Sequence, residues 1–194
     1  MQKIIDDLKE QLQNHHDHII LVGYDGCGKK NIANRIAKRM ALPYINVEHE
    51  IEKAADRSIK DIIDDFGIEA YHQGAFKVIE RLLQAKTSVF VIDQSIYNNP
   101  AVKDLLTKQG VTVWINNDPE RANTSRTGHN AYHDDAPKQQ TDSPDVHPQL
   151  LVPADDVFGG ANLHILSYKG PCSNIVRRTL RAIARHVGVL KEHH

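Results

Sequence analysis

The chain has 194 residues, of which 40% are hydrophobic and 25% are charged, and this ordinary composition excludes a fibrous repeat, a chain disordered throughout and a disulfide-dense scaffold. Its 24 Lys and Arg residues balance 25 Asp and Glu residues, so the net charge of -1 favours neither nucleic acid nor a membrane as a partner. It has only two cysteines, and no apolar run reaches the roughly 18 residues of a membrane span. Because the N-terminus also lacks the basic start and apolar middle of a signal peptide, the sequence predicts a cytoplasmic protein.

Helical and strand-like stretches alternate along the chain, which predicts helices packed on a mostly parallel sheet. Residues 1–17 carry an apolar face and are expected to form a helical extension before a single domain at 18–194. Five strands are expected, each a short run rich in Val and Ile, at 19–23, 44–47, 88–92, 111–115 and 163–167. Three further helices are expected, one around 32–40, one that ends at 83 and one at 173–187.

Caps mark the ends of the shorter helices. Ser58 begins a capping box, and Gly67 is expected to end that helix. Pro100 behind Asn99 is typical of a first helical turn, and we expect that helix to end at Gly110.

The segment from Gly128 to Gly160 departs from this pattern, since it holds four of the eight prolines, many polar residues and little periodicity. A loop of this length in a compact domain is usually functional or disordered. We predict that residues 126–160 form a mobile lid.

The strongest chemical signal is the sequence GYDGCGK at 23–29, which follows an apolar strand and opens a helix, as a phosphate-binding P-loop does. Its glycines let backbone N–H groups turn toward phosphate oxygens, the helix N-terminus adds positive potential, and Lys29 reaches the terminal phosphates. We therefore expect nucleotide phosphates to be held by Gly23, Asp25, Gly26, Cys27, Gly28, Lys29, Lys30 and Asn31.

The position after Lys29 normally carries a Ser or Thr hydroxyl that contacts Mg²⁺, and here it is Lys30. A protonated lysine cannot ligate a metal. Two consequences stay open: Lys30 replaces part of the metal's charge at the phosphates, or the loop holds an anion without supporting turnover. Asp93 ends an apolar run in the manner of a Walker B acid and is the candidate Mg²⁺ ligand; the alternative is an aspartate that caps the next turn.

These motifs belong to a longer pattern that resembles the shikimate kinases, which are small P-loop kinases. The resemblance rests on the loop, on LPYINVEHEIEKAADRSIKDIIDDFGIEAYH at 42–72, and on NNPAV, QGVTVWINNDPE and SRTGHN further along. It implies a three-layer α/β/α domain with a five-stranded parallel sheet in the order 2-3-1-4-5 and a lid over ATP. It also implies transfer of the terminal phosphate of ATP to the 3-hydroxyl of shikimate, on the pathway to chorismate and the aromatic amino acids.

The resemblance also assigns roles to single residues. Lys29 and Arg126 would contact the ATP phosphates, and Glu48 would position or activate the acceptor hydroxyl. His72 stands where the family has the arginine that grips the shikimate carboxylate, and Gln94 lies in the place of a three-glycine turn beside the substrate. The nucleotide half of the site is partly kept, whereas the shikimate half is largely rewritten.

Two functions are therefore open. The first is an ATP-dependent kinase that binds a nucleotide and a small hydroxylated acid, with shikimate the default acceptor. The second is a catalytically impaired pseudokinase that binds nucleotide or phosphate in a regulatory or structural role, and this alternative leaves a protein partner open.

Overall fold

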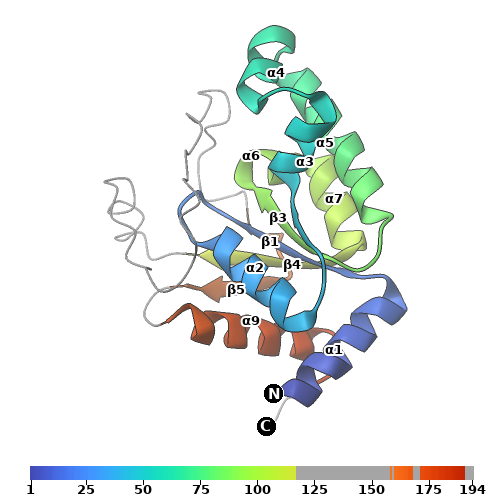
Figure 1. Cartoon of the computed structure of the whole chain (residues 1–194), viewed down its shortest axis with the longest axis vertical. Helices are drawn as coiled ribbons and strands as arrows, with labels where there is room; N and C mark the ends of the chain where they lie inside the picture. Colours follow the sequence, from blue (N-terminus) through green and yellow to red (C-terminus); the bar gives the residue numbers. More distant parts are fainter. Residues whose placement is uncertain (117–157, 159, 168–170, 191–194) are drawn as a thin grey trace.

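The computed structural model describes residues 1–116, 158, 160–167 and 171–190. Within them, five parallel strands form one sheet in the order β2-β3-β1-β4-β5 (Figure 1), which confirms the predicted topology. The strands are β1 (His18–Gly23), β2 (Tyr44–Asn46), β3 (Val89–Asp93), β4 (Gly110–Asn116) and β5 (Leu163–Leu166).

Helices cover both faces of this sheet, as the predicted three-layer α/β/α architecture requires (Figure 1). Those on one face are α1 (Gln2–His15), α2 (Lys29–Met40) and α9 (Cys172–His186). Those on the other are α3 (Val47–Ala55), α4 (Ile59–Phe66), α5 (Ile68–Leu83), α6 (Gln94–Tyr97) and α7 (Pro100–Lys108). No helix in these described parts of the chain is long and apolar enough to span a membrane.

The central strand β1 separates two apolar cores, because successive side chains of a strand point to opposite faces. Ile19 and Leu21 belong to the core under α1, α2 and α9, whereas Ile20 and Val22 belong to the core under α3 to α7. All four side chains are buried. A run of apolar residues without alternation is thus what a central parallel strand with two covered faces needs.

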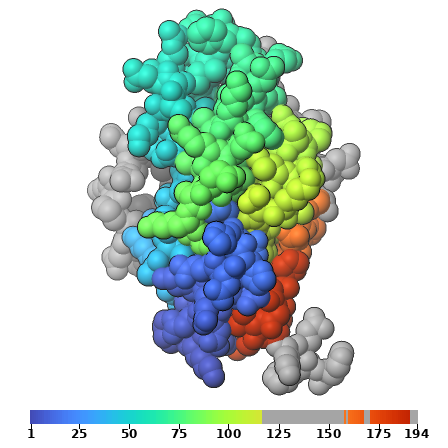
Figure 2. All heavy atoms as spheres, turned by 90° about the vertical axis from the view of Figure 1, so that its right-hand side faces the viewer, coloured from blue at the N-terminus to red at the C-terminus, as the bar shows by residue number. Residues whose placement is uncertain are grey.

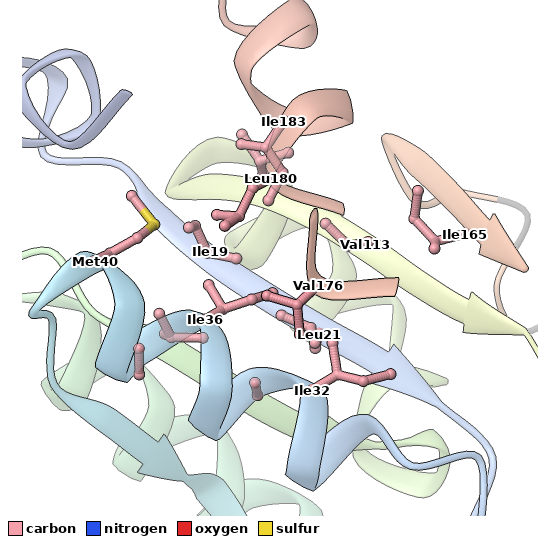
Figure 3. Close-up of a cluster of buried hydrophobic side chains, with 14 of the residues drawn as sticks. Ile19, Leu21, Ile32, Ile36, Met40, Val113, Ile165, Val176, Leu180 and Ile183 are labelled. Atoms are coloured by element: carbon pink, nitrogen blue, oxygen red, sulfur yellow. The ribbon is translucent and has the colours of Figure 1, made fainter. Parts of the chain in front are cut away.

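The first core is filled from α2 and α9, whose apolar faces point at the strands between them (Figure 3). Ile32 and Ile36 of α2 meet Leu180 and Ile183 of α9 in one cluster over β1 and β4. The four-residue spacing seen in the sequence therefore marks the buried face of α2.

The predicted caps are present, with one exception. The Ser58 hydroxyl accepts a hydrogen bond from the Asp61 amide at 3.1 Å, and the Asn99 side chain accepts one from the Ala101 amide at 2.9 Å. Gly110 does not end α7, which stops at Lys108; it begins β4 instead. A Cβ there would collide with the His18 backbone, so the glycine serves the close approach of two strands.

Two helices follow directly on strands and were not predicted. The strand expected up to Val47 ends at Asn46, and α3 starts at the next residue; α6 likewise begins where β3 ends. The acidic residues Glu48 and Glu50 in the first turn of α3 are a signal that favours a helix start there.

The expected N-terminal helix α1 packs into the first core rather than standing apart from it. Ile5, Leu8 and Leu12 are buried in the cluster that α2 and α9 form. Figure 2 shows α1 and α9 side by side at the end of the molecule opposite α4. The α1 helix therefore contributes to the stability of the domain.

We expect Leu8→Ala to lower the free energy of unfolding by about 2–5 kcal/mol, because Leu8 is fully buried and its removal leaves a cavity. Urea unfolding followed by circular dichroism measures this. Glu10→Ala on the exposed side of the same helix is the matched control. Equal midpoints for the two variants would show that α1 adds nothing to the core.

Candidate active site

The P-loop lies at the carboxyl edge of the sheet, where the register of two strands fixes its surroundings. β1 and β3 are parallel neighbours, and Gly23 at the end of one pairs with Asp93 at the end of the other. Since the carboxyl ends of parallel strands meet at the same edge, Asp93 is placed directly beside the loop.

The loop residues predicted to hold phosphate surround the start of α2. A Cβ on Gly23 would come within 2.6 Å of the Ile115 carbonyl oxygen and 2.9 Å of Cys27 Sγ, so only glycine fits there. Cys27 itself is buried, and burial raises the pKa of its thiol to about 11. Gly28 precedes α2 without a side-chain cap, and the first turn of that helix has no acidic residue. The positive end of the helix therefore faces the loop with no acidic side chain in its own first turn.

Lys29 is the most buried charge in the loop. Its side chain is 3% exposed, and its Nζ lies 2.6 Å from Asp93 Oδ1 and 3.3 Å from Asp25 Oδ1. It also donates a hydrogen bond to the Tyr24 carbonyl oxygen at 3.2 Å. Burial is the largest single effect and acts to lower the pKa of Lys29, but the charges of Asp93 and its other neighbours together outweigh burial and hold that pKa above its ordinary value. The ammonium group therefore stays charged.

A second contact between a lysine and a carboxyl group lies beside the first. The side chain of Lys30 is half-exposed, and its Nζ lies 2.9 Å from Glu48 Oε2. The pKa of Glu48 is raised to about 8, and burial is the largest cause. A hydrogen bond with Asp93 and repulsion from its charge raise this pKa further, whereas Lys30 acts to lower it. The pKa of Asp93 is shifted the other way. Burial alone would raise that pKa, but the hydrogen bond with Glu48 and the charge of Lys29 hold it below its ordinary value. At neutral pH, Glu48 thus carries the proton that the two carboxyl groups share.

The residues expected to bind the acceptor are only partly brought together. Gln94 begins α6 directly after Asp93, so it adjoins the charged cluster, and its Oε1 is buried without a hydrogen-bond partner in the described structure. His72 lies on α5, and its Nε2 is likewise buried and unpartnered within those residues. It lines a hollow of about 310 Å³ between α5 and α7, and in the described part of the chain Glu48 and Gln94 do not line that hollow.

Several predicted residues are placed elsewhere. Asn31 is exposed on α2 and accepts a hydrogen bond from Arg35 Nε at 3.2 Å, and Asp25 is more than half exposed. Arg126 and most of the expected lid at 126–160 lie outside the described residues.

The sequence did not reveal an aromatic wall next to the loop. Phe158 is 1% exposed, and its ring stands 5.1 Å from that of Tyr24, 5.2 Å from that of Trp114 and 5.9 Å from that of Tyr97, measured between centroids. Because Tyr24 belongs to the P-loop, this wall packs against the loop itself. Phe158 falls in a stretch without periodicity, so no sequence signal marked it as a core residue.

Comparisons with known proteins agree with this geometry. The family model for shikimate kinase matches residues 25–165. The chain belongs to the shikimate kinase family. A shikimate kinase from Bartonella quintana is 27% identical over 188 residues, which cover 94% of this chain and 87% of the relative. One from Caulobacter vibrioides is 34% identical over 102 residues, which cover 53% of this chain and 51% of the relative.

Solved structures of shikimate kinases share the fold. The enzyme from Bacteroides thetaiotaomicron superposes with a TM-score of 0.68 at 16% identity, covering 86% of this chain and 98% of its own. The enzyme from Acinetobacter baumannii, solved in complex with shikimate, gives a TM-score of 0.68 at 18% identity over 91% of this chain and 97% of its own. A gluconokinase from Sinorhizobium meliloti gives 0.58 at 17% identity, covering 87% of this chain and 92% of its own.

The residues at this site do not fit the Mg²⁺ ion that shikimate kinases use. Mg²⁺ needs oxygen ligands in an octahedron. Lys30 replaces the loop hydroxyl, Asp93 is in contact with the ammonium of Lys29, and Glu48 is in contact with that of Lys30. Among the described residues, no group of three His, Cys, Asp or Glu side chains could hold a metal ion. Asp93, the predicted Mg²⁺ ligand, is instead found in an ion pair with Lys29, and its metal role stays a prediction.

We expect Lys29→Met to lower the free energy of unfolding by about 3 kcal/mol, because it leaves the Asp93 carboxylate buried without its partner. Urea unfolding measures the loss. Adding Asp93→Asn to this variant should restore most of it, since the uncompensated charge is then gone. Lys38→Met, on the exposed side of α2, should change stability little. If Lys29→Met were as stable as the wild type, the ion pair with Asp93 would not be needed for the stability of the fold.

Proposed function

We propose that this chain transfers the terminal phosphoryl group of ATP to a small hydroxylated acceptor, with shikimate as the first candidate. The observation that carries this is the cluster at the carboxyl edge of the sheet, where buried Lys29 and the carboxyl pair of Glu48 and Asp93 meet at the P-loop. Membership of the shikimate kinase family supports both the reaction class and the acceptor to try first.

The residues divide the work of such a transfer. The uncapped first turn of α2 and the Lys29 ammonium would stabilise negative charge on the phosphates. As the acceptor oxygen bonds to the γ-phosphorus, the bond from that phosphorus to the bridging oxygen breaks, and ADP leaves. Glu48, in its deprotonated form, would take the proton from the acceptor hydroxyl.

Two amide side chains, which carry no charge, lie at the ends of β2 and β3. The amides of Asn46 and Gln94 each have a buried oxygen without a partner among the described residues. A hydroxyl can donate a hydrogen bond to such an oxygen, whereas a carboxylate can only accept. His72 also cannot replace the two-pronged contact that an arginine makes with a carboxylate. These groups favour an acceptor recognised through its hydroxyls.

A binding-only role is the second candidate, and the charge balance of the loop favours it. Lys29 is held by two carboxylates, so an incoming phosphate must compete with Asp25 and Asp93 for the same ammonium. If those carboxylates hold the ammonium more strongly than a phosphate does, the chain binds nucleotide or phosphate weakly and does not transfer a phosphoryl group.

Formation of ADP by the purified protein, with and without a high concentration of shikimate, separates these roles. We expect ADP formation to rise when shikimate is added, and to disappear in Lys29→Ala, which removes the loop ammonium. Lys38→Ala on the same helix should keep it. Nucleotide binding without any shikimate-dependent ADP would contradict shikimate as the acceptor, and the absence of ADP with a panel of sugars and polyols would leave the binding-only role.

We also expect the rate of phosphoryl transfer to rise with pH and to level off above about 8. Only deprotonated Glu48 can accept the hydroxyl proton, and its pKa is raised from 4.5 to about 8, so the competent form gains population through that range. Glu48→Gln should lower kcat by roughly 10²–10⁴-fold and remove this pH dependence. Glu50→Gln, on the same helix, should keep both. A wild-type rate independent of pH between 6 and about 9 would rule out Glu48 as the base.

A further inference from the structure

Two consecutive lysines occupy different places at the P-loop. Lys29 is buried against Asp93, whereas Lys30 reaches outward and is half-exposed, with its Nζ at 2.9 Å from Glu48. Glu48 and Asp93 are themselves joined by a hydrogen bond. The four side chains therefore form one row, with a carboxyl pair in the middle and an ammonium group at each end.

This row occupies the space in which a divalent cation would need its ligands. One oxygen of each carboxyl group, Asp93 Oδ1 and Glu48 Oε2, is already in contact with an ammonium group. A divalent ion placed between them would meet two fixed positive charges within a few ångströms, in a partly buried site where such repulsion is poorly screened. Lysine also has no lone pair to offer while it is protonated.

Lys30 is nevertheless well placed for a phosphate. It lies in the first turn of α2, at the positive end of the helix, and that turn itself carries no acidic residue. Its partner Glu48 also engages Asp93, so that carboxyl group is a weaker competitor than the carboxylate that holds Lys29. A half-exposed lysine can exchange such a partner for a phosphate oxygen without exposing any core residue.

We propose that the Lys30 ammonium serves as a fixed cation in place of a divalent metal, so that this chain binds nucleotide phosphates without requiring Mg²⁺. The inference rests on the proposed nucleotide-binding role and specifies the form of nucleotide that the site takes, which is the metal-free polyphosphate. It concerns binding alone and holds whether or not an acceptor is phosphorylated.

Titration calorimetry with ADP, in buffer with Mg²⁺ and in buffer with a chelator, tests this. We expect the wild-type dissociation constants in the two buffers to agree within about twofold. Lys30→Ser, which restores the hydroxyl, should weaken metal-free binding by at least about tenfold, the effect of losing one charge-assisted hydrogen bond, and should regain affinity when Mg²⁺ is added.

Two further variants serve as controls. Lys30→Arg keeps a cation at this position and should retain binding without metal. Lys38→Ser removes the same charge from the exposed end of α2 and should behave like the wild type in both buffers. Circular dichroism checks that every variant is folded.

Three outcomes would overturn the inference. The first is a wild-type affinity that rises about tenfold or more with Mg²⁺, and the second is a Lys30→Ser variant that matches the wild type in both buffers. Either leaves the proposed phosphoryl transfer standing. The third is a wild-type chain that binds ADP in neither buffer, which overturns the proposed function as well. Conversely, metal-independent binding by a chain with no detectable transfer supports this inference while the proposed reaction fails.

Discussion

The buried ion pair between Lys29 and Asp93 is the interaction around which the site is arranged. The register of β1 against β3 brings the end of one strand beside the end of the other, and the P-loop then delivers the lysine to the aspartate. Neither charge is tolerable alone at this depth, because removing one partner leaves the other without solvation. The pair therefore fixes both the loop and the first turn of α2 to the sheet edge.

The same pair sets the protonation of its neighbour. Because Lys29 keeps Asp93 ionised, the adjacent Glu48 meets a negative charge in a partly buried place, and its proton is retained up to about pH 8. The two carboxyl groups have pKa values shifted in opposite directions, which favours the anion on Asp93 and the proton on Glu48. Lys30 lies at the outer end of the row, and its partner Glu48 also engages Asp93.

The aromatic side chains beside the loop follow a different physical rule. The rings of Tyr24, Tyr97, Trp114 and Phe158 pack together against the loop. Because Tyr97 and Phe158 are buried, this wall supports the loop from within the core. The fold is retained at 16–18% identity to solved shikimate kinases.

The sequence by itself determined the strands, their order by family resemblance, the P-loop and the break at Lys30, since each is encoded in local patterns of apolar residues, glycines and caps. The sequence placed Gly110 at a helix end, because a local pattern does not reveal that two strands approach each other closely there. It did not predict α3, because this helix follows its strand without an intervening loop. Only the tertiary structure decided that Asp93 pairs with Lys29 and that Phe158 belongs to the core. These contacts join residues far apart in the chain, and their energies depend on burial, which a sequence pattern does not specify.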